Sequence, residues 1–206
     1  MSSSPSETEA AAETETQAHP LQEYADEVAE VVGGSAEVHF DTIKVRVASE
    51  HWVDAHLSAR DQLGLVFFSW LSAIDWSNAV EVGDALSDEV EERLELLTTL
   101  GDISEGRRVT FSTDLDRESP MIPTLVEVYA GANWHEREAH EMFGIDFLGH
   151  PNLAHLYLPD GFIGNPLRKS FPLLTREVKP WPGKVDVEAM PETAAKDEPS
   201  TENPEA

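Results

Sequence analysis

Hydrophobic residues recur at two different spacings in the first third of the chain, and these spacings predict a helix followed by strands. Residues 20–32 have a helical spacing that ends at Gly33, with apolar positions at Leu21, Tyr24, Ala25, Val28 and Val32. Residues 43–47 alternate apolar with basic side chains, which is typical of a half-buried strand. Residues 37–40 precede this strand closely enough to pair with it as a hairpin.

A second helix and three further strands are expected next. Ser49 is a candidate N-cap for a helix that carries Trp52 and His56 on its apolar side and stops near Gly64. The segment LVFFSWLSAIDW, residues 65–76, is too apolar and aromatic for the surface, so we expect it to be a central strand. Two alternating segments predict strands over 92–100 and 107–115, and the acidic stretch 81–91 predicts a loop or a short exposed helix.

The last expected element is a charged helix that begins at Asn133. Asn133 is a good N-cap with Glu136 three residues later, and Gly144 is suited to end the helix after Phe143. The whole order is helix, two strands, helix, three strands and helix. It predicts an α+β fold in which helices pack against one mixed sheet, followed by a long extended tail.

The distribution of charge and proline predicts four regions. We expect a disordered acidic tail over 1–19, an α+β domain over 20–130, a helix with an extended partner-binding tail over 131–184, and a second disordered acidic tail over 185–206. Within residues 150–184 lie six prolines, many apolar side chains and a local charge of +3. Prolines exclude a regular helix or central strand there, and the apolar content predicts that the segment needs a surface. That surface is either the chain's own domain or an acidic partner that meets Arg168, Lys169 and Arg176.

Composition excludes several functional classes. Lys and Arg number 14 against 40 Asp and Glu, a net charge of −26, so we expect no nucleic-acid partner. There is no cysteine, which excludes disulfides, thiolate nucleophiles and ligation of iron–sulfur clusters by this chain. The N-terminus lacks the features of a signal peptide and no window approaches the roughly 18 apolar residues of a spanning helix. We therefore expect a soluble cytoplasmic protein with no direct membrane insertion.

Three chemical interpretations of the charged helix compete. The first is a zinc site, but His135 and His140 lie five residues apart, about 140° around the helix, and do not converge on one ion. The second is acid and base work by Glu138 and Glu141, against which an ordinary i,i+4 ion pair between Arg137 and Glu141 is the simpler interpretation. The third is recognition of a partner by the charged face, and the pattern alone leaves the last two open.

The helix and the tail together resemble a known family. The succession of Glu-Arg-Glu, a Phe-Gly-Ile core, Gly-His-Pro, Leu-Pro, Pro-Leu-Arg-Lys and Phe-Pro-Leu is similar to the C-terminal block of the 30 kDa type of subunit, the C subunit, of respiratory complex I. The residues that carry the likeness, or that we expect at a partner contact, are Trp134, Glu136, Arg137, Glu138, Glu141, Phe143, Gly144, Gly149, His150, Pro151, Leu158, Pro159, Pro166, Leu167, Arg168, Lys169, Phe171 and Pro172.

The resemblance implies an assembly role. A subunit of this type would have no catalytic residue or cofactor of its own, because the flavin and the iron–sulfur clusters of the proton-translocating NADH:quinone oxidoreductase lie in partner subunits. It would lie in the hydrophilic arm, against the quinone-site subunit and its iron–sulfur neighbour, on the cytoplasmic face of the bacterial inner membrane. The turn into the tail would be fixed by Trp134, Arg137, Glu138, Glu141 and Phe143. The tail would be anchored on the partner by Arg168, Lys169 and Phe171.

The sequence departs from the family pattern at several positions. These departures change the expected ion pairs with partner subunits but leave the resemblance to the family intact. Glu141 stands where Asp is usual, Asn152 to His155 replace a typical Asp-Leu and two arginines, and Ser170 replaces an Asp. Two alternatives stay open. One is the equivalent subunit of a related membrane-bound hydrogenase or other donor-linked dehydrogenase, and the other is a stand-alone hydrolase that uses Glu138 and Glu141.

Overall fold

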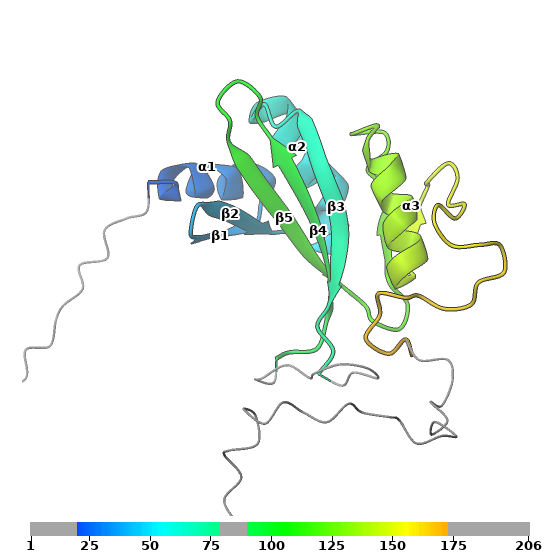
Figure 1. The fold of residues 1–206 in the computed structure, drawn as a ribbon. Helices are drawn as coiled ribbons and strands as arrows, with labels where there is room; N and C mark the ends of the chain where they lie inside the picture. The colour runs from blue at the N-terminus through cyan, green and yellow to red at the C-terminus, as the bar shows by residue number, and fades with distance from the viewer. Residues whose placement is uncertain (1–19, 79–89, 173–206) are drawn as a thin grey trace, which may run out of the picture. The chain divides into compact units, whose positions relative to one another are not determined.

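A computed structural model describes residues 20–78 and 90–172 of the chain (Figure 1). The two predicted disordered tails, nearly all of the acidic stretch 81–91 and residues 173–184 of the predicted partner-binding tail lie outside the described residues. The expected α+β class with a mixed sheet is confirmed.

The N-terminal elements follow the predicted pattern. Helix α1 (Gln22–Val32) ends at Gly33, whose φ of 70° suits a residue without a Cβ atom. Strands β1 (Ser35–His39) and β2 (Thr42–Arg46) pair antiparallel as a hairpin. The apolar side of α1, with Ala25 and Val28 fully buried, therefore faces the core as the spacing indicated.

The second helix is confirmed, but its expected cap is not. A single 3-10 turn, η1 (Ser49–His51), leads into α2 (Trp52–Gln62). The N-cap position of the turn is Ala48, with no side-chain cap hydrogen bond, so the prediction that Ser49 caps the helix is wrong. Trp52 and His56 are fully buried, and burial lowers the pKa of His56 to about 4. The His56 imidazole is thus a neutral core side chain.

Three longer strands complete a five-stranded sheet in the order β1-β2-β5-β4-β3. They are β3 (Phe67–Asp75), β4 (Leu94–Gly101) and β5 (Arg108–Leu115). Strand β2 pairs parallel with β5, and the other neighbours pair antiparallel. All eight residues of β4 are buried, so the central position that we predicted for 65–76 belongs instead to β4 and β5.

Strand β3 is an edge strand, which corrects the prediction of a central one. Leu71 and Ala73 point into the core, whereas Phe67, Trp70 and Ile74 are exposed on the opposite face. A β-bulge between Phe68 and Trp70 shifts the register against β4. The segment is apolar on both faces as a central strand would be, yet only one of these faces is covered within the described chain.

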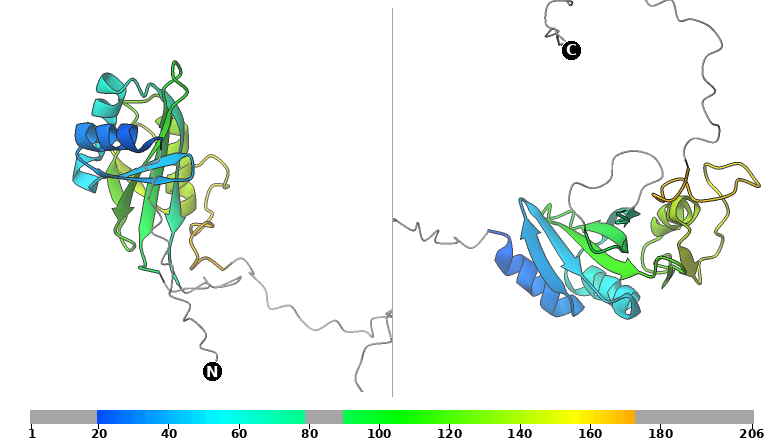
Figure 2. Two further views of the ribbon diagram at one scale, coloured as in Figure 1. Left: turned by 90° about the vertical axis from the view of Figure 1, so that its left-hand side faces the viewer. Right: turned by 90° about the horizontal axis from the view of Figure 1, so that it is seen from below.

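The helices cover the sheet unequally. Helices α1 and α2 pack on one face, and Figure 2 shows the described helices absent from the opposite one, which we call the open face. Helix α3 (Ala132–Phe143) lies beside β3 at the edge of the sheet (Figure 1). Strands β6 (Met121–Pro123) and β7 (Asp146–Leu148) flank α3 in sequence and pair parallel with each other. Among the helices of residues 20–78 and 90–172, none has the length and apolar character needed to cross a membrane.

Candidate functional site

Helix α3 begins one residue earlier than predicted and is not capped by Asn133. Its N-cap is Gly131, no side-chain cap bond forms, and Asn133 lies within the first turn. The predicted C-terminal end at Gly144 is confirmed, with a φ of 73° and its N–H donated to His140 O. The ring of His135 lies 5.5 Å from that of Phe68, which fixes α3 against β3.

Glu136 is a buried tie between α3 and the turn after β6. Its carboxyl group accepts hydrogen bonds from the Thr124 hydroxyl and, at 2.6 Å, from the Leu125 N–H. We expected Glu136 to reach back and cap its own helix, and this prediction is wrong because its carboxyl group is engaged by Thr124 and Leu125. Burial raises the pKa of Glu136 to about 7, despite the two donors that favour the charged form.

His150 lies beside this carboxyl group. Its Nδ1 accepts the Asn152 N–H at 3.0 Å, so Nε2 carries the proton and faces Asn133 O at 3.3 Å and Glu136 at 3.9 Å. Burial lowers the pKa of His150, so the imidazole is neutral. The Gly-His-Pro turn is thereby joined to the first turn of α3.

Arg137 and Glu141 hold the residues that follow this turn. Arg137 donates from Nε to Ala154 O at 2.8 Å and from Nη2 to His155 O at 3.1 Å, while its guanidinium lies 5.2 Å from the Trp134 ring centroid. We call Arg137 and Glu141 the clamp. Both bind peptide groups of residues 154–158 rather than each other, which contradicts the interpretation of the two as an ordinary i,i+4 ion pair.

Glu141 is the acidic half of the clamp. Its buried carboxylate accepts three successive backbone N–H groups, from Leu156 at 2.9 Å, from Tyr157 at 3.2 Å and from Leu158. Burial alone would raise the pKa of Glu141, but the three donors lower it below its usual value. A carboxylate held in this way is poorly suited to share a proton with Glu138, which argues against the acid and base interpretation.

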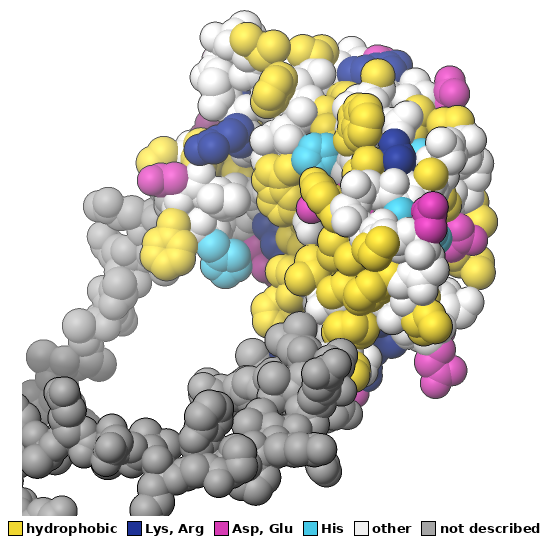
Figure 3. Space-filling view, turned by 45° about the vertical axis from the view of Figure 1, so that its right-hand side comes forward, with side chains coloured by type: hydrophobic (Ala, Val, Ile, Leu, Met, Phe, Trp, Pro, Cys, Tyr) yellow, Lys and Arg dark blue, Asp and Glu magenta, His cyan; other side chains and the backbone are white. Residues whose placement is uncertain are grey.

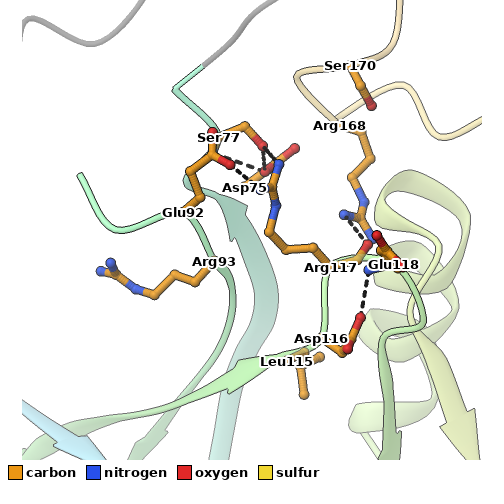
Figure 4. A pocket seen from close by; sticks show the side chains of 10 residues that line it. All are labelled: Asp75, Ser77, Glu92, Arg93, Leu115, Asp116, Arg117, Glu118, Arg168 and Ser170. Carbon is orange, nitrogen blue, oxygen red and sulfur yellow. Dashed lines mark hydrogen bonds and ion pairs between the residues drawn. The ribbon is translucent and has the colours of Figure 1, made fainter. Parts of the chain in front are cut away.

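Arg168 and Lys169 also bind the chain's own domain. Arg168 donates from Nε to Phe143 O at 2.6 Å and from Nη1 to Arg117 O at 3.2 Å. The Lys169 N–H reaches Asp75 Oδ2 at 3.0 Å, and its Nζ reaches Ser77 O at 2.8 Å. Of these residues, Asp75, Ser77, Arg117 and Arg168 line an open polar cavity of about 620 Å³ at the end of β3 (Figure 4). The polar groups expected to anchor the tail on a partner are thus partly used within the chain, and whether they also touch a partner stays a prediction.

Apolar side chains of the same segment point outward. The rings of Phe162 and Phe171 stack 5.9 Å apart, which brings two parts of the irregular segment together. Tyr157 is 65% exposed and Ile163 is 91% exposed, and Trp134 and Leu167 are exposed as well. Figure 3 shows hydrophobic side chains gathered over this segment and along the border between the sheet and α3. The segment combines a hydrogen-bonded backbone with an apolar outer surface, a combination suited to a partner contact.

The remaining motif residues shape the path of the segment. Gly149 has a φ of 84°, the Leu167 N–H reaches Met142 O at 3.1 Å, and Leu158 bonds to Glu141. Of the motif prolines, Pro151, Pro159 and Pro172 are exposed and Pro166 is half-buried. These positions agree with a shaping role and do not test a partner contact.

Sequence reasoning missed three polar residues that hold the site together, namely Asp75, Thr124 and Asn165. Asp75 lies 94 residues before Lys169, and Thr124 lies 12 before Glu136, so no local spacing pointed to either contact. Asn165 donates to Glu141 O at 3.0 Å from within the irregular segment. No cluster of three or more metal-ligating side chains occurs among residues 20–78 and 90–172.

Comparisons with known proteins agree on one family. Residues 45–177 match the family model described as the respiratory-chain NADH dehydrogenase, 30 Kd subunit. The chain is similar to the C subunit of the NADH-quinone oxidoreductase of Rhodobacter capsulatus, with 38% identity over 157 residues, which are 74% of this chain and 73% of that one. It is 35% identical over 147 residues to the equivalent protein of Roseiflexus sp. (strain RS-1), covering 70% and 78% of the two chains.

Two solved structures share the fold. One is the trypsin-resistant fragment of Nqo5, with a TM-score of 0.50 and 22% identity, covering 63% of this chain and 97% of that one. The other is a chain of the membrane-bound sulfane sulfur reductase, an archaeal respiratory membrane complex, with a TM-score of 0.60 and 18% identity over 82% and 98% of the two chains. At these identities the likeness concerns the fold alone.

Proposed function

This chain belongs to the family of the 30 kDa subunit of respiratory-chain NADH dehydrogenase, and from that membership we propose that its work is assembly. It is a subunit of the NADH-quinone oxidoreductase, an enzyme complex of electron transport. In our proposal it supplies no catalytic residue. It holds neighbouring subunits of the hydrophilic arm in fixed positions, which electron transfer between separate centres requires.

The clamp is the observation that carries this proposal. Arg137 and Glu141 are charged residues on a helix, but both use their charge on peptide groups of one irregular segment rather than on a cavity. Hydrogen bonds to charged groups are worth about 1.5–3 kcal/mol each, so the segment is held firmly without secondary structure of its own. A firmly held apolar surface loses little conformational entropy when a partner binds it.

The proposed partners are the quinone-site subunit and its iron–sulfur neighbour. The surface offered to them includes exposed Tyr157, Ile163 and Leu167. In the sequence, residues 150–184 have a charge of +3 in a chain of −26. Such a surface favours a partner that is apolar at the centre of the contact and acidic at its rim.

We propose that all cofactors of the complex lie on other subunits. This is supported by the absence of cysteine from the sequence, since iron–sulfur clusters are ordinarily held by cysteine thiolates. Flavin and iron–sulfur clusters would then belong to partner chains, and no nucleic acid would be bound. The location we propose is peripheral, on the cytoplasmic face of a bacterial inner membrane, where the complex couples electron transfer to proton translocation. Bacterial relatives support this location.

Assembly of the complex in membranes tests the proposal. Ile163→Asp with Leu167→Asp places two charges on side chains that contact little of their own domain, so the isolated chain should unfold at the same temperature as wild type. The amount of intact complex on a native gel should fall roughly tenfold or more. Phe40→Asp, at a 93% exposed residue on the tip of the β1-β2 hairpin, is the matched control and should assemble normally. Normal assembly of the double variant would refute the role of this surface.

A related complex with another electron donor is the second candidate. The fold likeness to a chain of the archaeal sulfane sulfur reductase supports it, at a lower identity than the likeness to the NADH-quinone oxidoreductase relatives. Mass spectrometry of the intact complex decides between the two, because a flavin-containing NADH module and a nickel–iron or sulfur-reducing module contain different chains. A stand-alone hydrolase is not proposed, since Glu141 is engaged by three N–H groups.

A further inference from the structure

Glu138 differs from the other charged residues of α3 in having no partner. Helix α3 carries one arginine and three glutamates, and Glu136, Arg137 and Glu141 each bind peptide groups outside the helix. The Glu138 carboxylate forms no hydrogen bond or ion pair among residues 20–78 and 90–172. The residue is half-buried, so it has lost part of its contact with water and gained no protein partner in return.

Glu138 lines an open pocket of about 340 Å³ that is shared by α3 and the irregular segment. Trp134 and His135 line the pocket from the first turn of the helix, and Leu156 and Tyr157 line it from the segment. Trp134 and Glu138 are four residues apart and so lie on one side of α3. A volume at the low end for ligand pockets suits a single side chain better than a cofactor.

The walls of this pocket are already held in place. Glu141 accepts the N–H groups of Leu156 at 2.9 Å and of Tyr157 at 3.2 Å, which fixes the segment beside the helix. The Trp134 ring centroid lies 5.2 Å from the Arg137 guanidinium, within the clamp. Because the pocket is formed in advance, little conformational entropy is lost when a side chain fills it.

The charges of the elements that form or contact the pocket favour a cation as its occupant. Arg137, the only basic residue of α3, already donates to two carbonyl groups of the segment. Strand β3, on which α3 packs, has no Lys or Arg. In the segment, Arg168 and Lys169 bind carbonyl groups at the C-terminal end of α3 and after β3. With histidines counted as neutral, no basic side chain of these elements is left to pair with Glu138.

A guanidinium group fits this combination better than an ammonium group. It is planar, it stacks on aromatic faces, and it forms two parallel hydrogen bonds with a carboxylate. The pocket offers both kinds of contact, since the exposed ring of Tyr157 and the carboxylate of Glu138 line it together. Arginine is also among the residues that most often supply the binding energy of a protein contact.

We propose that this pocket receives an arginine side chain of a partner subunit, whose guanidinium pairs with Glu138 and stacks on Tyr157. This inference rests on the proposed function and deepens it, because it names the group by which a partner engages the surface of residues 150–172. The arginine lies at the α3 side of that surface, apart from Arg168 and Lys169, where acidic groups of the partner are favoured.

Photo-cross-linking in the intact complex identifies what faces the pocket. Benzoylphenylalanine replaces Tyr157 in one strain, which keeps an aromatic ring there. In a second strain it replaces Ile163, which is exposed on the same segment but does not line the pocket. A cross-link from position 157 to an arginine-containing peptide of a partner subunit supports the proposal.

The other outcomes of the cross-linking overturn it. A cross-link from position 157 to a peptide without arginine, to a second copy of this chain or to the chain's own residues 173–184 shows a different occupant. Reaction at position 163 alone overturns the pocket proposal and leaves the proposed function standing. Absence of cross-links from both positions overturns the two together.

Charge reversal tests the ion pair itself. Glu138→Lys should lower the amount of intact complex about tenfold or more, and Glu138→Gln should lower it roughly threefold. Glu30→Lys, the same change at an exposed residue of α1 that also has no partner in the described chain, should assemble like wild type. Thermal unfolding of each full chain shows whether the fold is retained, and Glu138→Gln serves where Glu138→Lys unfolds.

Rescue separates a direct pair from general damage to the surface. Replacement of the cross-linked arginine by glutamate should restore assembly in the strain that carries Glu138→Lys, because the pair is then re-formed with the charges exchanged. Wild-type assembly of a folded Glu138→Lys or Glu138→Gln chain would overturn the proposal, and so would a failure of the exchanged pair to restore assembly.

Discussion

At the scale of single residues, the charged groups of the motif bind the polypeptide backbone more than they bind each other. Arg137, Glu141 and Arg168 all have peptide carbonyl or N–H groups as partners, with donor–acceptor distances that include 2.8 Å for Arg137, 2.9 Å for Glu141 and 2.6 Å for Arg168. A segment without regular structure has peptide groups left unpaired, and buried ones must find partners. The charged side chains supply these partners, which explains why a polar helix can be buried along part of its surface.

Glu136 should make stability depend on pH. Its carboxyl pKa is about 7 in the folded chain against a usual 4.5, so the folded state binds the proton more tightly than the unfolded state. Its contribution is fully present below about pH 4.5 and is lost as pH rises to about 7. We expect wild type to lose roughly 3 kcal/mol of unfolding free energy relative to Glu136→Gln between pH 5 and 8. Urea unfolding of both proteins across this range measures the difference.

The neighbouring imidazole provides the control for this experiment. His150 has a lowered pKa, so its contribution to stability rises with pH below its usual value of 6.5, which is the opposite direction. In His150→Gln, the free energy of unfolding should therefore no longer rise with pH below 6.5, while the decrease with pH that is due to Glu136 should remain. Parallel pH profiles of wild type and Glu136→Gln would contradict the prediction.

At the scale of elements, periodicity in the sequence identified nearly every long helix and strand. It did not identify which strands lie side by side in the sheet. The spacing of Ala25 and Val28 and the alternation of Ile43 with Lys44 are local signals, and both predicted the correct element. The place of β3 at the edge depends on pairings with residues 94–101, and the burial of Glu136 depends on Thr124. Local patterns contain no information about such distant contacts. For this reason the apolar content of β3 wrongly indicated burial on both faces, and the charge of Glu136 wrongly indicated exposure.

Two glycines with the same backbone conformation make a matched test of the end of α3. Gly144 and Gly106 have φ values of 73° and 70°, but an added Cβ at Gly144 would stand 2.7 Å from Asn165 Oδ1, whereas no atom lies within 4 Å at Gly106. Each change to Ala should cost about 1 kcal/mol for the left-handed conformation. Gly144→Ala should cost about 1 kcal/mol more, because the hydrogen bond from Asn165 to Glu141 O is displaced. Equal unfolding free energies of the two variants would show that Asn165 adapts freely.

At the scale of the whole molecule, two surfaces of different origin lie on one small domain. The outer surface of residues 150–172 is held by the clamp. The exposed apolar side chains of β3, Phe67, Trp70 and Ile74, are held by the sheet itself. Helix α3 packs against β3 (Figure 1) and binds residues 154–158 through the clamp. A single domain that exposes two separate apolar surfaces is suited to hold two partners at a fixed distance, which agrees with the proposed assembly role.

The proposed peripheral location predicts the behaviour of the chain on washing of membranes. Alkaline carbonate removes proteins held by surface contacts and leaves those that span the bilayer. We expect this chain to enter the supernatant while an integral membrane protein of the complex stays in the pellet, as immunoblots of both fractions would show. Retention of the chain with the integral protein would contradict the location.

The parallel pairing of β2 with β5 has a consequence for biosynthesis. Residues 43–46 cannot take their place until residues 109–112 have left the ribosome, because these residues are their partners. At about 5–20 residues per second, the early hairpin waits several seconds for translation to supply its neighbour. Helix α3 and the segment that follows it emerge later still. A nascent chain truncated before α3 therefore lacks the surface of residues 150–172 that we propose as a partner contact.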